Sequence, residues 1–114
     1  MESLVIGALV GLVIVFIVRK VFVKAVPAAE VQALLDAGAM LVDVRSPSEF
    51  SGGSLKGAKS MPMGSLPKGL DKSVPIVVFC ASGMRSAKVA RDWSKQGFQV
   101  TNLGSMGAGS GLKL

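Results

Sequence analysis

The chain has 114 residues, with 13 Lys and Arg against 7 Asp and Glu, one Cys and no His, which gives a formal net charge of +6. One Cys without His excludes an internal disulfide, a Cys/His zinc site and a histidine general base. The basic excess is small and scattered, and the few aromatic residues read as core residues, so we expect no nucleic-acid partner. An anionic small substrate is compatible with this charge.

The N-terminal segment is strongly apolar. Its main run, LVIGALVGLVIVFIV from Leu4 to Val18, is 15 residues without a charge. A bilayer-spanning helix needs roughly 20 residues, but snorkelling side chains at Arg19 and Lys20 would bring residues 21–23 into the span. We therefore expect residues 1–24 to form a transmembrane anchor with a basic flank.

The basic residues follow the apolar run, whereas a cleaved secretory signal carries its positive charges first. By the positive-inside rule this order places the C-terminal domain in the cytoplasm. We expect a single-pass protein of the cell membrane, with lipid as one partner. Cleavage within the small-residue stretch Ala25–Ala29 remains the alternative.

Helical and extended patterns alternate after the anchor. In chain order, the expected elements are a helix over Ala28–Ala37, a strand over Met40–Val44, a helix start at Ser46–Glu49, loops over Ser51–Lys72 with a short strand near Lys59–Met61, a strand over Pro75–Phe79, a helix over Ser86–Gly97 and a strand over Phe98–Leu103. This order predicts an α/β domain over residues 25–103, with a mostly parallel sheet that binds ligands at the C-terminal ends of its strands. A flexible Gly/Ser-rich tail is expected over residues 104–114.

Cys80 follows the strongest strand signal and precedes a glycine-containing loop that runs into a helix. Backbone N–H groups of such a loop favour negative charge, and Arg85 adds positive charge, so we expect a lowered Cys80 pKa and a thiolate near neutral pH. A thiolate can take sulfur from a donor such as thiosulfate and hold it as a persulfide. The alternative is an ordinary buried thiol. Ser82, Gly83 and Ser86 make the stretch after Cys80 polar, which argues against that alternative.

Two segments resemble the signatures of the rhodanese, or thiosulfate sulfurtransferase, family. LVDVRSPSEFSGGSLKGAKSMP resembles the first signature, and PIVVFCASGMRSAKVARDWSKQGF resembles the active-site strand, loop and helix. The matching positions in the first signature are Asp43, Arg45, Glu49, Phe50, Gly53, Gly57, Ala58 and Pro62. The resemblance covers Pro27–Leu103 and implies a five-stranded, mostly parallel sheet flanked by helices, no metal or other cofactor, and a persulfide on Cys80. It further implies that the anion is held by Ala81, Ser82, Gly83, Met84, Arg85 and Ser86.

Three features depart from the family pattern. Ser54 replaces a usual histidine, Lys56 replaces a proline, and the stretch from Gly104 to Gly111 lacks the Trp that often follows the last strand. We expect changed local packing near Ser54 and a looser C-terminal edge.

Two charged residues at the end of the first strand have a structural expectation. Asp43 and Arg45 are expected to tie this strand end to nearby backbone or to Glu49. A direct role for Arg45 in substrate binding stays open, because it lies near the C-terminal edge of the sheet.

The activity expected from these features is transfer of sulfane sulfur from thiosulfate or a persulfide donor to a thiol, protein or cyanide acceptor. A phosphatase or arsenate reductase would need five residues between Cys and Arg to surround a tetrahedral oxyanion, whereas four separate Cys80 from Arg85. A thiol–disulfide oxidoreductase would need a second cysteine. A membrane-tethered, non-catalytic binding module of the same fold is the alternative from a different class.

Overall fold

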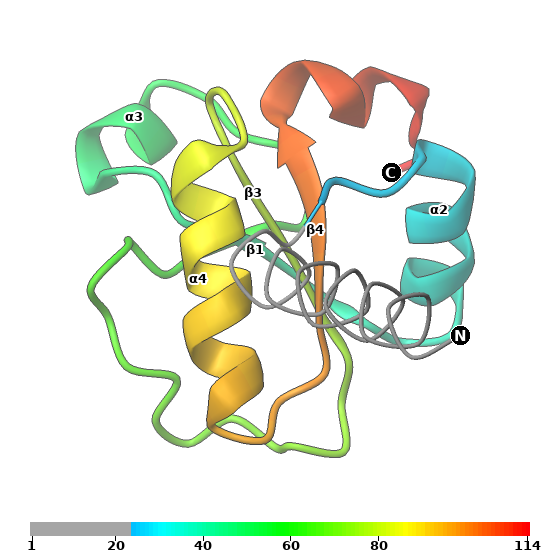
Figure 1. The fold of residues 1–114 in the computed structure, drawn as a ribbon. Helices are drawn as coiled ribbons and strands as arrows, with labels where there is room; N and C mark the ends of the chain where they lie inside the picture. The colour runs from blue at the N-terminus through cyan, green and yellow to red at the C-terminus, as the bar shows by residue number, and fades with distance from the viewer. Residues whose placement is uncertain (1–23) are drawn as a thin grey trace, which may run out of the picture.

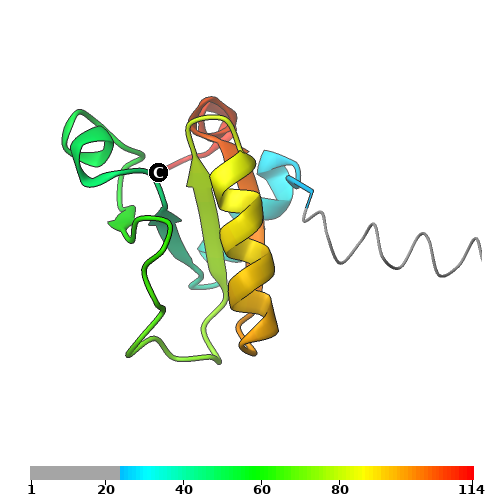
Figure 2. The ribbon, with the colours of Figure 1, turned by 60° about the vertical axis from the view of Figure 1, so that its left-hand side comes forward.

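The computed structural model describes residues 24–114. Its elements are α2 (Ala28–Asp36), β1 (Met40–Asp43), α3 (Pro47–Ser51), β2 (Lys59–Ser60), β3 (Ile76–Cys80), α4 (Met84–Lys95), β4 (Val100–Ser105) and the 3-10 helix η1 (Met106–Gly111). The strands form one sheet in the order β2-β1-β3-β4, and every neighbouring pair is parallel. Helix α4 lies on one side of the sheet and α2 on the other, which gives three layers (Figures 1 and 2).

The alternation of side chains along β3 builds the two halves of the core. All five residues of this strand are buried, as the unbroken apolar run predicts. Ile76, Val78 and Cys80 belong to the cluster that packs against α4. Val77 and Phe79 belong to the opposite cluster, which packs against α2. Cys80 therefore lies on the α4 face of the sheet, at the C-terminal end of a central strand.

Helix α3 begins with a capping box. The backbone N–H of Glu49 donates to Ser46 Oγ at 3.2 Å, and the Ser46 N–H donates to Glu49 Oε1 at 3.2 Å. Pro47 occupies the first turn, where its missing N–H costs nothing. The short helix confirms the helix start expected from the sequence, and it places the Glu49 carboxylate beside the sheet's C-terminal edge.

The expectation of five strands is wrong for the described residues, which contain four. On the outer edge of β4, the described residues before α2 make a single parallel bridge, between Ala25 and Asn102. The Val26 N–H donates to the Asn102 carbonyl at 2.9 Å. Pro27 then ends the pairing, because proline has no N–H to donate and its fixed φ leads the chain into α2.

The C-terminal segment contains regular structure beyond the predicted domain end at Leu103. β4 continues to Ser105, and Met106–Gly111 forms η1. Gly109 is buried, and a Cβ there would lie 2.6 Å from Cδ1 of Leu55, so η1 packs closely on that leucine. The flexibility of the tail stays a prediction.

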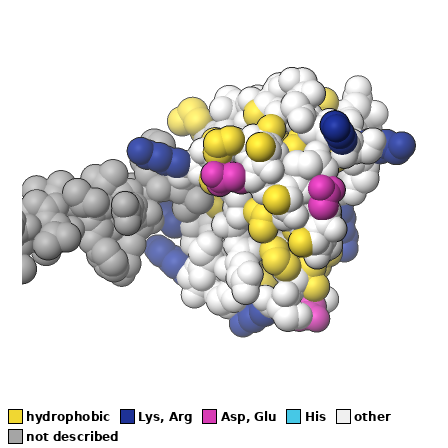
Figure 3. Space-filling view, turned by 90° about the vertical axis from the view of Figure 1, so that its right-hand side faces the viewer, with side chains coloured by type: hydrophobic (Ala, Val, Ile, Leu, Met, Phe, Trp, Pro, Cys, Tyr) yellow, Lys and Arg dark blue, Asp and Glu magenta, His cyan; other side chains and the backbone are white. Residues whose placement is uncertain are grey.

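The described part of the chain includes no helix that is both long and apolar enough to cross a membrane. The predicted anchor, residues 1–24, lies outside the described residues except for Lys24. On the face that carries α2 and the C-terminus, Lys and Arg side chains lie mostly towards the rim, whereas apolar side chains gather towards the middle with acidic ones beside them (Figure 3).

Candidate active site

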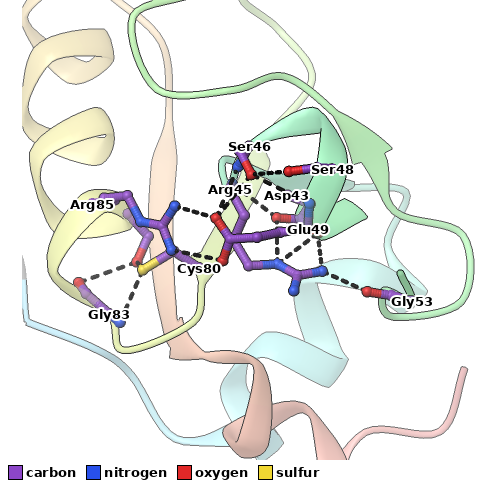
Figure 4. Close-up of polar contacts among 10 residues, drawn as sticks. Asp43, Arg45, Ser46, Ser48, Glu49, Gly53, Cys80, Gly83 and Arg85 are labelled. Carbon is purple, nitrogen blue, oxygen red and sulfur yellow. Dashed lines mark hydrogen bonds and ion pairs between the residues drawn. The ribbon is translucent and has the colours of Figure 1, made fainter. Parts of the chain in front are cut away.

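The Cys80 sulfur sits in a cradle of hydrogen-bond donors at the end of β3. The Gly83 backbone N–H donates to Sγ at 2.9 Å, and the Ser86 hydroxyl lies 3.5 Å from it (Figure 4). Cys80 has 0% of its surface exposed. We call residues 81–86 the Cys80 loop.

The conformation of the Cys80 loop depends on one glycine. Gly83 has φ 95°, in the left-handed region that favours glycine, and it caps the N-terminus of α4. The turn at Gly83 starts α4 at Met84, two residues earlier than the predicted start at Ser86. Arg85 and Ser86 consequently lie in the first helical turn, where backbone N–H groups are free of intrahelical partners and favour a nearby anion.

Two opposing effects act on the Cys80 pKa. Burial raises the pKa of the thiol, because the charged form is desolvated. Hydrogen bonds from the side chain and backbone of Ser86, and from the backbones of Gly83 and Ser82, lower it further than burial raises it. The net effect is a Cys80 pKa below its ordinary value, in the direction expected from the sequence.

The Arg85 side chain is held by an ion pair with Glu49. Its guanidinium donates from Nη1 to Glu49 Oε1 at 2.7 Å and from Nη2 to Oε2 at 3.1 Å, which links α4 to α3 (Figure 4). This pairing raises the pKa of Arg85, and the negative Cys80 contributes to the increase less strongly than Glu49 does. The arginine therefore adds positive charge near the sulfur while its own hydrogen bonds go mainly to Glu49.

Asp43 and Arg45 form a buried ion pair beside the site. Arg45 Nη2 lies 2.8 Å from Asp43 Oδ2 and also donates to the Gly53 carbonyl at 2.6 Å. Ser54 donates its hydroxyl to Asp43 Oδ2 at 2.7 Å, so the residue that replaces the usual histidine still supports this carboxylate. The expected structural role of the pair is confirmed, and its partner is the backbone of Gly53. Glu49 instead pairs with Arg85.

The remaining residues of the Cys80 loop form an exposed rim. Ala81 and Ser82 are exposed, and Met84 has 80% of its surface exposed. A hollow of about 730 Å³ adjoins the back of the loop between α4 and β4, and Ser82, Gly83 and Met84 form part of its wall. Cys80 is not part of that wall, so this hollow does not reach the sulfur.

Two residues of β4 behind the Cys80 loop carry no signal in the sequence. Asn102 is buried in β4, and its Oδ1 accepts the Gly104 N–H at 2.9 Å. The Gly104 carbonyl lies 3.4 Å from the Ser86 hydroxyl, so Gly104 contacts the site from the neighbouring strand. Neither residue belongs to a short motif, and only the pairing of β3 with β4 brings them to the loop. No group of His, Cys, Asp or Glu among residues 24–114 is arranged to hold a metal ion.

Comparison with known proteins identifies the family. A family model described as the rhodanese-like domain matches residues 27–107. The chain belongs to the rhodanese-like family. Its relatives include the thiosulfate sulfurtransferase GlpE of Stutzerimonas stutzeri, which is 33% identical over 78 residues, covering 66% of this chain and 72% of that protein. The putative sulfurtransferase YtwF of Bacillus subtilis is 38% identical over 66 residues, covering 55% of this chain and 64% of that protein.

Solved structures agree with this assignment. A rhodanese-like domain protein from Staphylococcus aureus superposes with a TM-score of 0.64 at 31% sequence identity, covering 80% of this chain and 97% of that one. The rhodanese-like α/β fold is thus present, with a parallel sheet flanked by helices. At the level of the family, the activity is that of a sulfurtransferase.

Proposed function

We propose that this rhodanese-like domain transfers sulfane sulfur through a persulfide on Cys80. The observation that carries the proposal is the cradle of the sulfur: a thiol at the end of β3 whose hydrogen bonds from Gly83 and Ser86 lower its pKa despite complete burial. A thiolate is the nucleophilic form of cysteine, and the same donors suit a negatively charged sulfur beyond it. The names of several relatives, which specify thiosulfate sulfurtransferases, support thiosulfate as a donor.

The proposed cycle has two displacements. The Cys80 thiolate attacks the outer sulfur of thiosulfate, a sulfur–sulfur bond to Cys80 forms, and sulfite leaves with the electron pair of the broken bond. A thiolate acceptor or cyanide then attacks the terminal sulfur and regenerates the Cys80 thiolate, which gives a persulfide or thiocyanate. A persulfide donor enters the first step in the same way, with a thiolate as leaving group. The cycle needs no outside oxidant or reductant.

The buried sulfur places a requirement on this cycle. Cys80 has no exposed surface, whereas Ala81, Ser82 and Met84 at the rim of its loop are exposed. A donor reaches Sγ only when part of this rim moves. Met84 is suited to such movement because its side chain is flexible and packs little in the present arrangement.

The cellular setting is part of the proposal. The apolar run that ends at Val18, followed by Arg19 and Lys20, supports a single membrane anchor with the domain on the cytoplasmic side. The sulfur acceptor is then a thiol or protein persulfide near the membrane. Detection of the intact N-terminus in isolated membranes, and loss of the domain on protease treatment of inverted vesicles, would test this arrangement.

Mass spectrometry tests the persulfide directly. Incubation of the full chain with thiosulfate is expected to add the mass of one sulfur atom to Cys80, and addition of cyanide is expected to remove it as thiocyanate. Cys80→Ser is expected to abolish both, with an unchanged circular dichroism spectrum. Thiocyanate release by the serine variant at the wild-type rate would overturn the assignment.

The full burial of Cys80 favours one other candidate, a non-catalytic binding module that retains the fold. In that case Cys80 takes up no sulfur, although its environment stays polar. The same mass measurement separates the two functions: an unmodified Cys80 after thiosulfate and low-molecular-weight persulfides supports the module, and loading supports the enzyme.

A further inference from the structure

The linker before α2 lies directly on the part of β4 that supports the Cys80 loop. Ala25 bridges to Asn102, and the Val26 N–H donates to the Asn102 carbonyl at 2.9 Å. Ala25, Gly83 and Gly104 also line the same hollow of about 730 Å³. Three segments far apart in the sequence therefore meet on one side of the Cys80 loop.

β4 is irregular at this meeting point. Val78 pairs with Asn102 but Phe79 pairs with Gly104, so Leu103 is an extra residue and the strand contains a bulge. Asn102 Oδ1 accepts the Gly104 N–H at 2.9 Å, and Gly104 has φ 95°. Bulges redirect the chain beside active sites, and this bulge brings the Gly104 backbone against the Cys80 loop.

Gly104 is closely approached by Ala25 on one side and by Gly83 on the other. A Cβ on Gly104 would lie 3.0 Å from the Ala25 Cβ, and a Cβ on Gly83 would lie 3.3 Å from the Gly104 Cα. Ala25, Gly104 and Gly83 are thus stacked in van der Waals contact. Close-packed groups of this kind transmit a displacement instead of absorbing it.

Two of the hydrogen-bond donors to the sulfur, the Gly83 N–H and the Ser86 hydroxyl, depend on Gly104. The N–H of Gly83 donates to Cys80 Sγ at 2.9 Å, and Gly83 rests on Gly104. The single hydroxyl proton of Ser86 is shared among Sγ at 3.5 Å, the Gly83 carbonyl at 3.1 Å and the Gly104 carbonyl at 3.4 Å. A shift of Gly104 therefore moves the Gly83 N–H. It also changes how strongly the Gly104 carbonyl competes with Sγ for the Ser86 hydroxyl proton.

We propose that the linker, through Ala25 and Gly104, positions the donors that keep Cys80 reactive. Ala25 and Gly104 are positioning residues, because neither contacts the sulfur. The coupling makes the reactivity of Cys80 depend on how the linker is seated on β4. The inference deepens the proposed function, but the thiol measurements that test it need no sulfur transfer.

The test compares two glycines with the same backbone strain. Gly104 and Gly64 have φ 95° and 96°, but a Cβ at Gly64 meets nothing within 4 Å. In the full chain in detergent, the pH profile of Cys80 alkylation by iodoacetamide is measured for Gly104→Ala and Gly64→Ala, together with the thermal midpoint. Gly104→Ala is expected to slow alkylation at neutral pH by roughly three- to tenfold, the effect of one weakened hydrogen bond, and to move the profile to higher pH. Gly64→Ala is expected to leave the profile in place.

Rescue tests the linker itself. Ala25→Gly removes the Cβ that crowds position 104, so the double variant Ala25→Gly with Gly104→Ala is expected to regain most of the alkylation rate. If Gly104→Ala does not fold, Ala25→Val applies the same pressure from the linker side, and Ala29→Val in α2 is the control. Equal profiles for Gly104→Ala and Gly64→Ala, or no effect of Ala25→Val, would overturn the inference. A wild-type chain without sulfur transfer but with these shifts would refute only the proposed function.

Discussion

The Arg85 guanidinium is held by the Glu49 carboxylate through two hydrogen bonds of 2.7 and 3.1 Å, across 36 positions of the sequence. The same carboxylate completes the capping box of α3 with Ser46. One side chain therefore fixes the start of α3 and the first turn of α4 together. Arg85 thus holds the Cys80 loop against α3, in addition to supplying positive charge near the sulfur.

Removal of the Glu49 charge tests this link. Glu49→Gln is expected to release Arg85, to lower the thermal midpoint slightly and to alter the affinity for thiosulfate, measured as KM, more than kcat. Asp92, which pairs with Lys88 on the outside of α4, supplies the control Asp92→Asn. Equal effects of the two variants on KM would contradict a specific role for the Arg85–Glu49 pair.

Stability at low pH should reflect the same pair. The Arg85 hydrogen bonds, followed by the Ser46 N–H, lower the Glu49 pKa from 4.5 to about 2. Because the folded value lies below the unfolded one, the carboxylate's contribution to stability is present above pH 4.5 and is lost as the pH falls towards 2. Between pH 6 and pH 2.5, the free energy of unfolding in urea is expected to fall less for Glu49→Gln than for the wild type. The same pH dependence in both proteins would count against a lowered Glu49 pKa.

Ser86 donates a side-chain hydrogen bond to the sulfur, and Ser86→Ala removes it. The expected result is a higher Cys80 pKa and a roughly three- to tenfold slower alkylation at neutral pH, since a net hydrogen bond contributes about 0.5–1.5 kcal/mol. Ser94→Ala on the exposed side of α4 is the matched control. A pH profile that does not move in Ser86→Ala would show that the backbone donors alone set the pKa.

Removing one partner of the buried Asp43–Arg45 pair is expected to be strongly destabilising. Asp43→Asn leaves the Arg45 guanidinium, whose side chain is 9% exposed, without its counter-charge. We expect a loss of about 3–5 kcal/mol in the free energy of unfolding, measured in urea. The control Asp71→Asn, at an exposed position, is expected to lower the free energy of unfolding by less than about 1 kcal/mol. Comparable losses in the two variants would contradict the importance of the buried pair.

Much of the fold follows from local patterns in the sequence. The apolar run before Cys80 indicates the central strand, and Ser46 with Glu49 three residues later indicates the helix start. Both signals act within a few residues, so the bounds expected for β3 and α3 lie close to those observed. The position of Cys80 at the tip of that strand follows for the same reason.

Long-range contacts explain the features that no local sequence pattern indicates. The pairing of Glu49 with Arg85 depends on the placement of α3 beside α4. The glycine and serine around Gly104 predict a tail, whereas its φ of 95° belongs to a bulge that contacts Gly83. Family resemblance implies a fifth strand, but Pro27 limits the described pairing to one bridge.

The ionisation of Cys80 is the most direct test of the account. The rate of iodoacetamide alkylation of the folded wild-type chain is measured as a function of pH, with the urea-unfolded chain as reference. The folded thiol is expected to titrate below the ordinary value of 9.0, because hydrogen bonds from Ser86, Gly83 and Ser82 outweigh its burial. A folded-state titration at or above that value, or alkylation that occurs only on global unfolding, would contradict it.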